Sequence, residues 1–285
     1  MKILSLGAAV LAVALSLPQT SFSQNKSETY KDIIEKAYNL SLQKDRQQAL
    51  NILITALQKE NRPQAVAELR KAVNDVATVF ISDKAQQTYE AGISLRKTDP
   101  VQAMGKLNEA VRIEADNLSI IVELARVMIA KGDCSGALDL LSKQAKLLPY
   151  NEELKLSSAQ ALLCQSSWVE YGKLYDSTEV KKSPLQKFWL ALEVERYFKI
   201  KNFTKSQEIL SIVKKTDGKY PEVSYWGWKL ANTAKKTDPE DAQKYVMTCK
   251  NISANQYRQY MIDPMLCRHL TEVEADLKGL NGTAE

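Results

Sequence analysis

The sequence is poor in residues that interrupt helices and in residues that carry out chemistry. Its 285 residues include only 10 glycines, 8 prolines and one histidine. Hydrophobic residues make up 45% and charged residues 26%, which is typical of long amphipathic helices joined by short turns. The length allows a sizeable core, so folding requires neither a metal nor disulfides on grounds of size. We therefore expect an all-α protein, ordered over most of its length.

Motifs of catalysis and cofactor binding are absent from the sequence. It contains no G-x-S-x-G elbow, P-loop, dinucleotide fingerprint, H-E-x-x-H or calcium loop. The single histidine, His269, lies between Arg268 and Leu270 in a segment expected to be helical, where a solvated or capping role is far more common than catalysis. We expect no enzymatic activity, no cofactor and no metal.

Neither positive nor negative charge is concentrated in one region of the sequence. The 39 basic and 34 acidic residues give a formal net charge of +5, and they are interleaved along the chain. A protein that follows a phosphate backbone needs a basic stripe or patch. We therefore do not expect nucleic-acid binding.

The only long apolar run lies at the N-terminus. Lys2 precedes an apolar stretch from Ile3 to Leu17, and Pro18 and the small residues Ser21 and Ser23 follow it. These are the three parts of a secretory signal peptide, and the run is shorter than the roughly 20 residues of a membrane span. We predict a signal peptide over residues 1–23, no membrane span, and a mature chain that is periplasmic or secreted.

Cysteine is scarce but even in number. The four cysteines are Cys134, Cys164, Cys249 and Cys267. In an exported chain an even count fits two disulfides, and the spacings match no C-x-x-C redox or zinc pattern. Four buried thiols are the alternative, because a free cysteine packs as a small hydrophobe.

Small and apolar residues recur every 34 residues. The equally spaced sets are Ala91, Ala125 and Ala159; Ala103, Ala137 and Tyr171; Leu107, Leu141 and Tyr175; and the turn residues Asn117 and Asn151. A fixed period indicates a repeat architecture, here with two amphipathic helices in each unit. In the first of these units we predict helices over Tyr89–Leu95 and Ala103–Ile113, with Asp99 as N-cap and Pro100 at the first helical position of the second.

This pattern resembles the tetratricopeptide repeat (TPR), which has the same period. The unit from Leu118 to Asn151 matches the family's pattern best, through Ala125, Gly132-Asp133, Ala137, Leu141 and Pro149. The resemblance extends from Tyr30 to about Asn255. It implies a right-handed α-solenoid of antiparallel helix hairpins.

Two segments depart from the repeat. Residues 64–83 break the register and predict one extra helix, Ala65–Phe80. Asp263–Lys278 opens on Asp-Pro and predicts a solvated capping helix that closes the stack. After the signal peptide we therefore expect an N-terminal hairpin plus the extra helix (24–83), a TPR-like array (84–255), and a capping helix with a tail (256–285).

The resemblance also implies where a partner would bind. In the family, the first helices of the hairpins line a concave groove, and binding usually happens there. Carried over to this sequence, the groove residues are Tyr38, Arg126, Ile129, Gln160, Leu163, Glu195, Phe198 and Trp228. The family's clamp for a terminal carboxylate is not expected, because its central positions here are Ile34, Thr88, Val122, Leu156 and Ala191.

Aromatic residues are concentrated in the C-terminal half, where they indicate either binding anchors or core packing. Trp226 and Trp228 point about 200° apart on a helix, so we expect at least one of them in the groove or the hairpin interface. If disulfides form, proximity along the implied solenoid suggests Cys134 with Cys164 and Cys249 with Cys267.

Taken together, these features predict a non-catalytic protein-binding scaffold or adaptor in the periplasm or secreted fraction, with another envelope or secreted protein as partner. A structural component of an envelope or secretion assembly is the alternative. A helical glycan-processing enzyme is a weaker one, suggested by the paired acids Glu152-Glu153 and Glu193/Glu195, which fall at helix starts and on helix faces where acids are usually structural.

Overall fold

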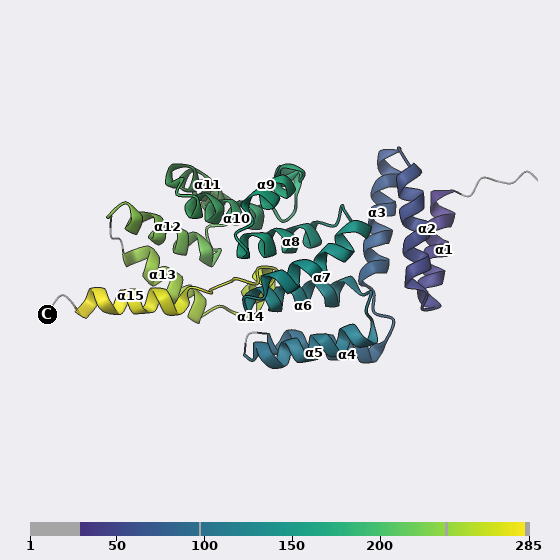
Figure 1. Cartoon of the computed structure of the whole chain (residues 1–285), viewed down its shortest axis with the longest axis horizontal. Coiled ribbons are helices and arrows are strands. Elements are labelled where there is room, and N and C mark those ends of the chain that lie inside the picture. Colours follow the sequence, from purple (N-terminus) through teal and green to yellow (C-terminus); the bar gives the residue numbers. More distant parts are fainter. Residues whose placement is uncertain (1–28, 97, 237–238, 283–285) are drawn as a thin grey trace, which may run out of the picture.

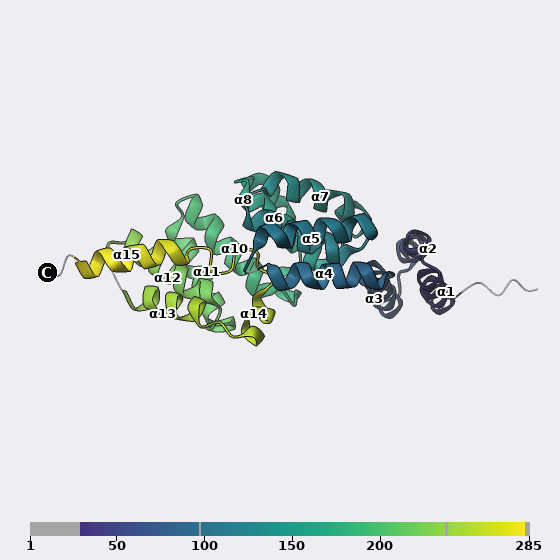
Figure 2. The same ribbon diagram turned by 90° about the horizontal axis from the view of Figure 1, so that it is seen from below.

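The computed structural model describes residues 29–96, 98–236 and 239–282, so the predicted signal peptide lies outside it. The described residues form an elongated all-α array without strands, with α1 at one end and α15 at the other (Figures 1 and 2). In chain order the elements are α1 (Tyr30–Leu42), α2 (Arg46–Lys59), α3 (Pro63–Thr78), α4 (Asp83–Leu95), α5 (Pro100–Ile113), α6 (Leu118–Ala130), α7 (Cys134–Leu147), α8 (Glu152–Cys164), α9 (Trp168–Asp176), the 3-10 turn η1 (Val180–Lys182), α10 (Gln186–Lys199), α11 (Phe203–Thr216), α12 (Pro221–Thr233), α13 (Pro239–Lys250), α14 (Ala254–Tyr260) and α15 (Leu270–Gly282).

The predicted repeat is confirmed. The helices α4, α6, α8, α10 and α12, which we call the A helices, begin 34 or 35 residues apart, and each packs against the helix that follows it. Small residues at the repeat positions are fully buried, as for Ala103, Ala125, Ala137 and Ala159. Their size lets the helices approach closely, so the solenoid follows from the pattern.

Capping side chains determine where the helices of each repeat begin. Asp99 accepts hydrogen bonds from the backbone N–H groups of Val101 and Gln102, and Pro100 opens α5, as predicted. Asn117 and Asn151 act in the same way at the starts of α6 and α8. Each cap satisfies N–H groups that the first helical turn leaves without partners.

The extra helix predicted between the first hairpin and the array is α3. It packs against α1 and α2 on one side and contacts α6 on the other. The hairpin of α4 and α5 lies to one side of α6, which α5 contacts (Figure 1). Helix α3 therefore joins the N-terminal hairpin directly to the array.

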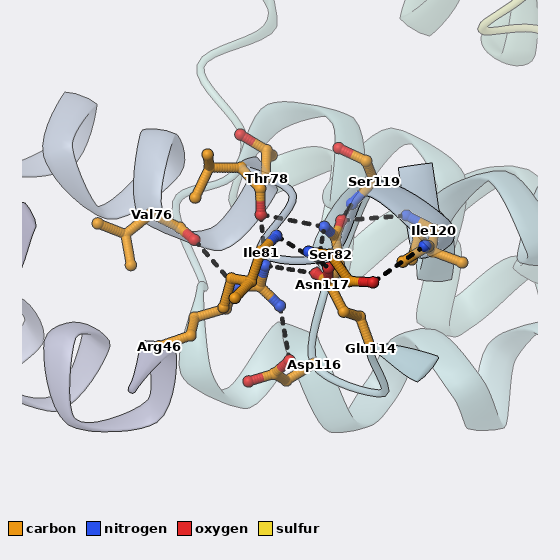
Figure 3. Close-up of polar contacts among 12 residues, drawn as sticks. Arg46, Val76, Thr78, Ile81, Ser82, Glu114, Asp116, Asn117, Ser119 and Ile120 are labelled. Atoms are coloured by element: carbon orange, nitrogen blue, oxygen red, sulfur yellow. Dashed lines mark hydrogen bonds and ion pairs between the residues drawn. The ribbon is translucent and has the colours of Figure 1, made fainter. Parts of the chain in front are cut away.

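A buried arginine fixes this junction (Figure 3). The side chain of Arg46, which is 1% exposed, forms ion pairs with Glu114 (2.7 Å) and Asp116 (2.6 Å) and donates to the carbonyl of Val76 (3.2 Å). Glu114 in turn accepts from the backbone N–H of Ser82 at 2.6 Å. The cluster holds α2, the end of α3 and the turn before α6 together.

The C-terminal capping helix begins later than predicted. Helix α15 starts at Leu270, and residues 261–269, which we call the strap, have no helix. The buried Asp263 carboxylate accepts from the backbone N–H of Met265, and Cys267 has a left-handed φ of 59°. These local contacts compete with helix formation, so the Asp-Pro signal marks the strap and not a helix start.

Both suggested cysteine pairs are disulfide-bonded, so the alternative of four free thiols does not hold. Cys134–Cys164 joins α7 to α8, and Cys249–Cys267 joins α13 to the strap, with Cα–Cα distances of 5.8 and 5.7 Å. Two disulfides are typical of a protein from an oxidising compartment. A search of the described helices for one long and apolar enough to cross a membrane finds none.

Candidate functional site: a groove with a filled half and an open half

The A helices α6, α8, α10 and α12 face a groove that the chain itself partly fills. The strap lies in the part formed by α8, α10 and α12, and we call this part the filled half. Helix α14 lies near the middle of the array, and the strap runs from it toward α15 (Figures 1 and 2). Next to α3, α6 and the start of α8 there is a cavity, which we call the open half.

Groove side chains hold the backbone of the strap. Arg96, at the end of α4, donates to the carbonyl oxygens of Met261 and Asp263. Gln160 of α8 donates to the carbonyl of Ile262 at 3.4 Å, and Glu222 of α12 accepts from the backbone N–H of Cys267 at 2.9 Å.

Side chains of the strap add a second set of contacts. The hydroxyl of Tyr220 donates to the Asp263 carboxylate, and Arg268 forms a 2.6 Å ion pair with Glu195 of α10. The imidazole of His269 stacks on the ring of Tyr225, with ring centroids 3.9 Å apart. The strap is therefore bound by main chain and side chains along its whole length.

Two buried carboxyl groups are neighbours where the strap packs on α12: Asp263 of the strap and Glu222 of α12. Burial, with a smaller contribution from the neighbouring Asp263 carboxyl, raises the pKa of Glu222 to about 8, while the hydrogen bond from the Cys267 N–H and the charge of Arg268 oppose the shift. Burial likewise raises the pKa of Asp263. In the described part of the chain neither carboxyl forms an ion pair, since Arg268 is paired with Glu195. A protonated Glu222 therefore suits this site better than a second negative charge.

The setting of His269 fits the capping role that the sequence allowed and not the solvated one. His269 directly precedes α15, its carbonyl accepts from the backbone N–H of Val273, and its side chain, 21% exposed, stacks on Tyr225. Burial, followed by the charge of Arg268, lowers the pKa of His269 to about 4. It is therefore neutral near pH 7 and helps to hold the strap.

The open half is a cavity of about 710 Å³. Its walls combine apolar residues with charged ones: Arg70, Lys71, Val73 and Asn74 of α3; Tyr89 of α4; Leu118, Ser119, Val122, Glu123 and Arg126 of α6; Tyr150, Glu152 and Glu153 at the start of α8; Phe188 of α10; and Gln259, Met261 and Ile262 at the entrance of the strap. This volume lies within the range of ligand-binding pockets.

The floor of the open half continues the charge network that holds the strap. Glu123, 1% exposed, is paired with Arg96 on one side and with Arg126 on the other, and Arg126 also pairs with Glu153 at 3.1 Å. Two residues that line the cavity each have a buried polar atom, Arg126 Nε and the Tyr150 hydroxyl, with no hydrogen-bond partner among the described residues. Such atoms are uncommon in folded proteins and are often found at functional sites.

Some of the predicted groove residues face the groove. Arg126 lines the open half, Gln160 and Glu195 contact the strap, and Phe198 packs against Trp226 beside it. Tyr38 is 37% exposed on α1 and donates to Asp75 of α3.

Three predicted groove residues need correction. Ile129 is fully buried and Trp228 is 1% exposed, both in the hydrophobic core, and Leu163, at 5%, lies beside Gln160 next to the strap. These three residues therefore offer no free surface to a partner. Trp226, 4% exposed, packs against Phe198 of α10 and lies edge-on to His269 of the strap, so one of the two tryptophans does lie at the groove.

The sequence interpretation missed Arg96, Tyr220, Glu222 and Asp263, which bind or belong to the strap. The available signal was the pair Asp263-Pro264 followed by Cys267, a cysteine inside a supposedly solvated helix. Among residues 29–96, 98–236 and 239–282, no three His, Cys, Asp or Glu side chains are grouped so as to hold a metal ion.

Comparisons with known proteins show a likeness among solved structures. No family model matches the chain, and no curated protein matches it. Among solved structures it is similar to the crystal structure of a tetratricopeptide repeat protein from Parabacteroides merdae, with 13% identity, a TM-score of 0.46, and coverage of 83% of this chain and 97% of that one. The site is therefore interpreted from this chain's own contacts.

Proposed function

We propose that this protein is a non-catalytic scaffold that holds a segment of a partner protein in the open half of its groove. The proposal rests on the contrast between the filled half and the open half of the groove. One part of the groove binds a polypeptide segment, the strap, while the adjoining part is a cavity of about 710 Å³ with the same mixture of apolar and charged walls.

The compartment belongs to the same proposal. The two disulfides favour an oxidising environment, and the predicted signal peptide supplies a route to it. A scaffold stiffened by disulfides loses less entropy when it binds, which suits a preformed groove. We therefore propose a periplasmic or secreted protein with an envelope or secreted partner.

The test blocks the open half without removing a contact. Ser119 lines the cavity from the first turn of α6, and its side chain takes no part in the hydrogen bonds of the described residues. Ser119→Trp fills the cavity, and Ser135→Trp is the matched control, because Ser135 is exposed and is the second residue of α7 as Ser119 is of α6. Mature protein from Gln24 onward is used as bait in an extract of the source cells and their medium.

The proposal expects a specific protein to be captured by the unaltered chain and by Ser135→Trp, and to be lost with Ser119→Trp. Capture that survives Ser119→Trp places the contact elsewhere on the molecule and contradicts the assignment of the open half.

A further inference from the structure

We propose that the open half binds its partner as an extended, non-helical chain with apolar side chains, and that Arg126 donates hydrogen bonds to main-chain carbonyl oxygens of that chain. The inference rests on the proposed function and specifies the form in which the partner is bound.

The two arginines beside Glu123 are the basis for this inference. Arg96 and Arg126 both pair with its buried carboxylate, and both have side chains less than 10% exposed. Arg96 uses its remaining N–H groups on the carbonyl oxygens of Met261 and Asp263. Arg126 borders the open half, and its contacts with Glu123 and Glu153 engage only part of its five N–H donors. The Glu123 carboxylate thus holds two arginines in place. Arg96 donates to the strap, and Arg126, beside the cavity, has N–H donors left for a partner.

The need for free carbonyl groups argues against a helical partner. Within a helix every carbonyl except the last four is already bonded to an N–H of the same helix. The strap has no helix, and three consecutive carbonyls, those of Met261, Ile262 and Asp263, accept bonds from groove side chains. An irregular or extended partner segment offers the same acceptors to Arg126.

The walls of the open half favour apolar side chains. Tyr89, Tyr150 and Met261 line the cavity and are partly exposed, so their apolar atoms are available to a partner, while Val73, Leu118, Val122 and Phe188 are buried behind them. The charged residues of the cavity balance one another, with Arg70, Lys71 and Arg126 against Glu123, Glu152 and Glu153. A balanced site gives a strongly charged segment no net attraction, whereas burial of apolar side chains is favourable whatever the charge of the site.

The open half is also continuous with the interface that holds the strap. Gln259, Met261 and Ile262 form one of its walls, so a bound partner lies end to end with the strap against the same A helices. The partner site is therefore complete only while the strap is docked.

A peptide experiment tests the inference with a defined probe. Twelve-residue random peptides displayed on phage are selected on the mature chain, and the best binder is synthesised with both ends blocked. One amide carbonyl at a time is then replaced by a thiocarbonyl, which is a weaker acceptor. Dissociation constants are measured for the unaltered chain, Ser119→Trp and Arg126→Met.

The expected result is binding that weakens at least about 10-fold with Ser119→Trp and with Arg126→Met, because a hydrogen bond to a charged group is lost in the second case. One or two thiocarbonyl positions weaken binding to the unaltered chain but not to Arg126→Met. Helix-favouring substitutions in the peptide are expected to reduce affinity. Thermal unfolding of each variant shows whether it is folded.

Two failures are distinguishable. No selected peptide, or binding that Ser119→Trp leaves unchanged, contradicts the proposed function as well as this inference. Binding that Ser119→Trp removes, but that is strengthened by helix-favouring substitutions or is indifferent to every thiocarbonyl, overturns the inference alone. If Arg126→Met does not fold, the thiocarbonyl scan and the helix-favouring peptides, both measured on the unaltered chain, still show whether the partner binds as an extended chain.

Discussion

The filled and open halves of the groove are made by the same kind of helix and yet have different roles. In the filled half the strap buries Glu222 and Asp263 and turns the A-helix face into a folding interface. In the open half the corresponding face borders a cavity, and its acid Glu153 has a side chain that is 57% exposed. A repeat therefore supplies the surface, and a segment outside the repeat decides which part of it remains available to a partner.

The largest effect is expected where the two halves share a charge network. Arg96→Met removes the donor to the strap and one of the two partners of the buried Glu123. Breaking a buried ion pair leaves a charge without its partner, so we expect the free energy of unfolding to fall by about 3–5 kcal/mol. Urea unfolding measures it, with Arg112→Met on the exposed surface of α5 as control. A loss no larger than that of the control would show that the network does not join the halves.

Removing one disulfide at a time tests whether the strap docks independently of the rest of the array. Replacing Cys249 and Cys267 together by serine unties the strap, whereas replacing Cys134 and Cys164 unties α7 from α8. Each loss is expected to destabilise the fold by about 2–4 kcal/mol. Only the first should speed amide exchange throughout the strap, which mass spectrometry resolves. Equal exchange of the strap in both double variants would contradict its independent docking.

The buried Glu222 makes the filled half sensitive to pH. Its folded-state pKa of about 8 lies above the ordinary value of 4.5, so the folded state binds the proton more tightly than the unfolded state does. The resulting stability is fully present below about pH 4.5 and is lost as the pH rises through 8, by about 1 kcal/mol per pH unit within that window.

The variant Glu222→Gln keeps an acceptor for the Cys267 N–H and should flatten this dependence. Thermal unfolding from pH 5 to pH 9 compares it with the unaltered chain. A parallel decline in both proteins would assign the effect to another group. His269 has the opposite effect on the pH dependence of stability. Its folded-state pKa of about 4 lies below the ordinary 6.5, so the stability it contributes is present above pH 6.5 and is lost as the pH falls through 4.

The smallest effect is expected in the open half. Ser119→Trp fills the cavity without breaking a side-chain contact, so the free energy of unfolding should change by no more than about 0.5 kcal/mol. Urea unfolding of Ser119→Trp and of the exposed control Ser135→Trp measures the difference. A large destabilisation would mean that the open half, like the filled half, is needed for folding.

The sequence was sufficient to predict the repeat but not the path of the strap. A period of 34 residues and capping side chains such as Asp99 and Asn117 are local features, so they place the helices correctly. Arg126, Gln160 and Glu195 lie on the A-helix faces that meet the cavity or the strap, and that any of them binds a partner stays a prediction. Their partners were not predictable, since Arg96 meets Met261 across 165 positions of sequence.

The errors at Ile129 and Trp228 have a different origin, because packing between neighbouring helices buries both residues. Periodicity shows which residues share a face, but a shift of one position along a helix exchanges a groove residue for a core residue. The strap itself was a separate omission. Only the odd position of Cys267, inside a supposed capping helix, hinted that this segment returns to the array.

The most direct test of the account is hydrogen exchange of the strap in the free, mature protein. The backbone N–H groups of Met265, Cys267 and His269 are bonded to Asp263, Glu222 and Tyr245. With the strap docked as described, they should exchange at least about 100-fold more slowly than in an unfolded chain. Exchange at the rate of an unfolded chain would contradict the account, because the whole groove would then be open.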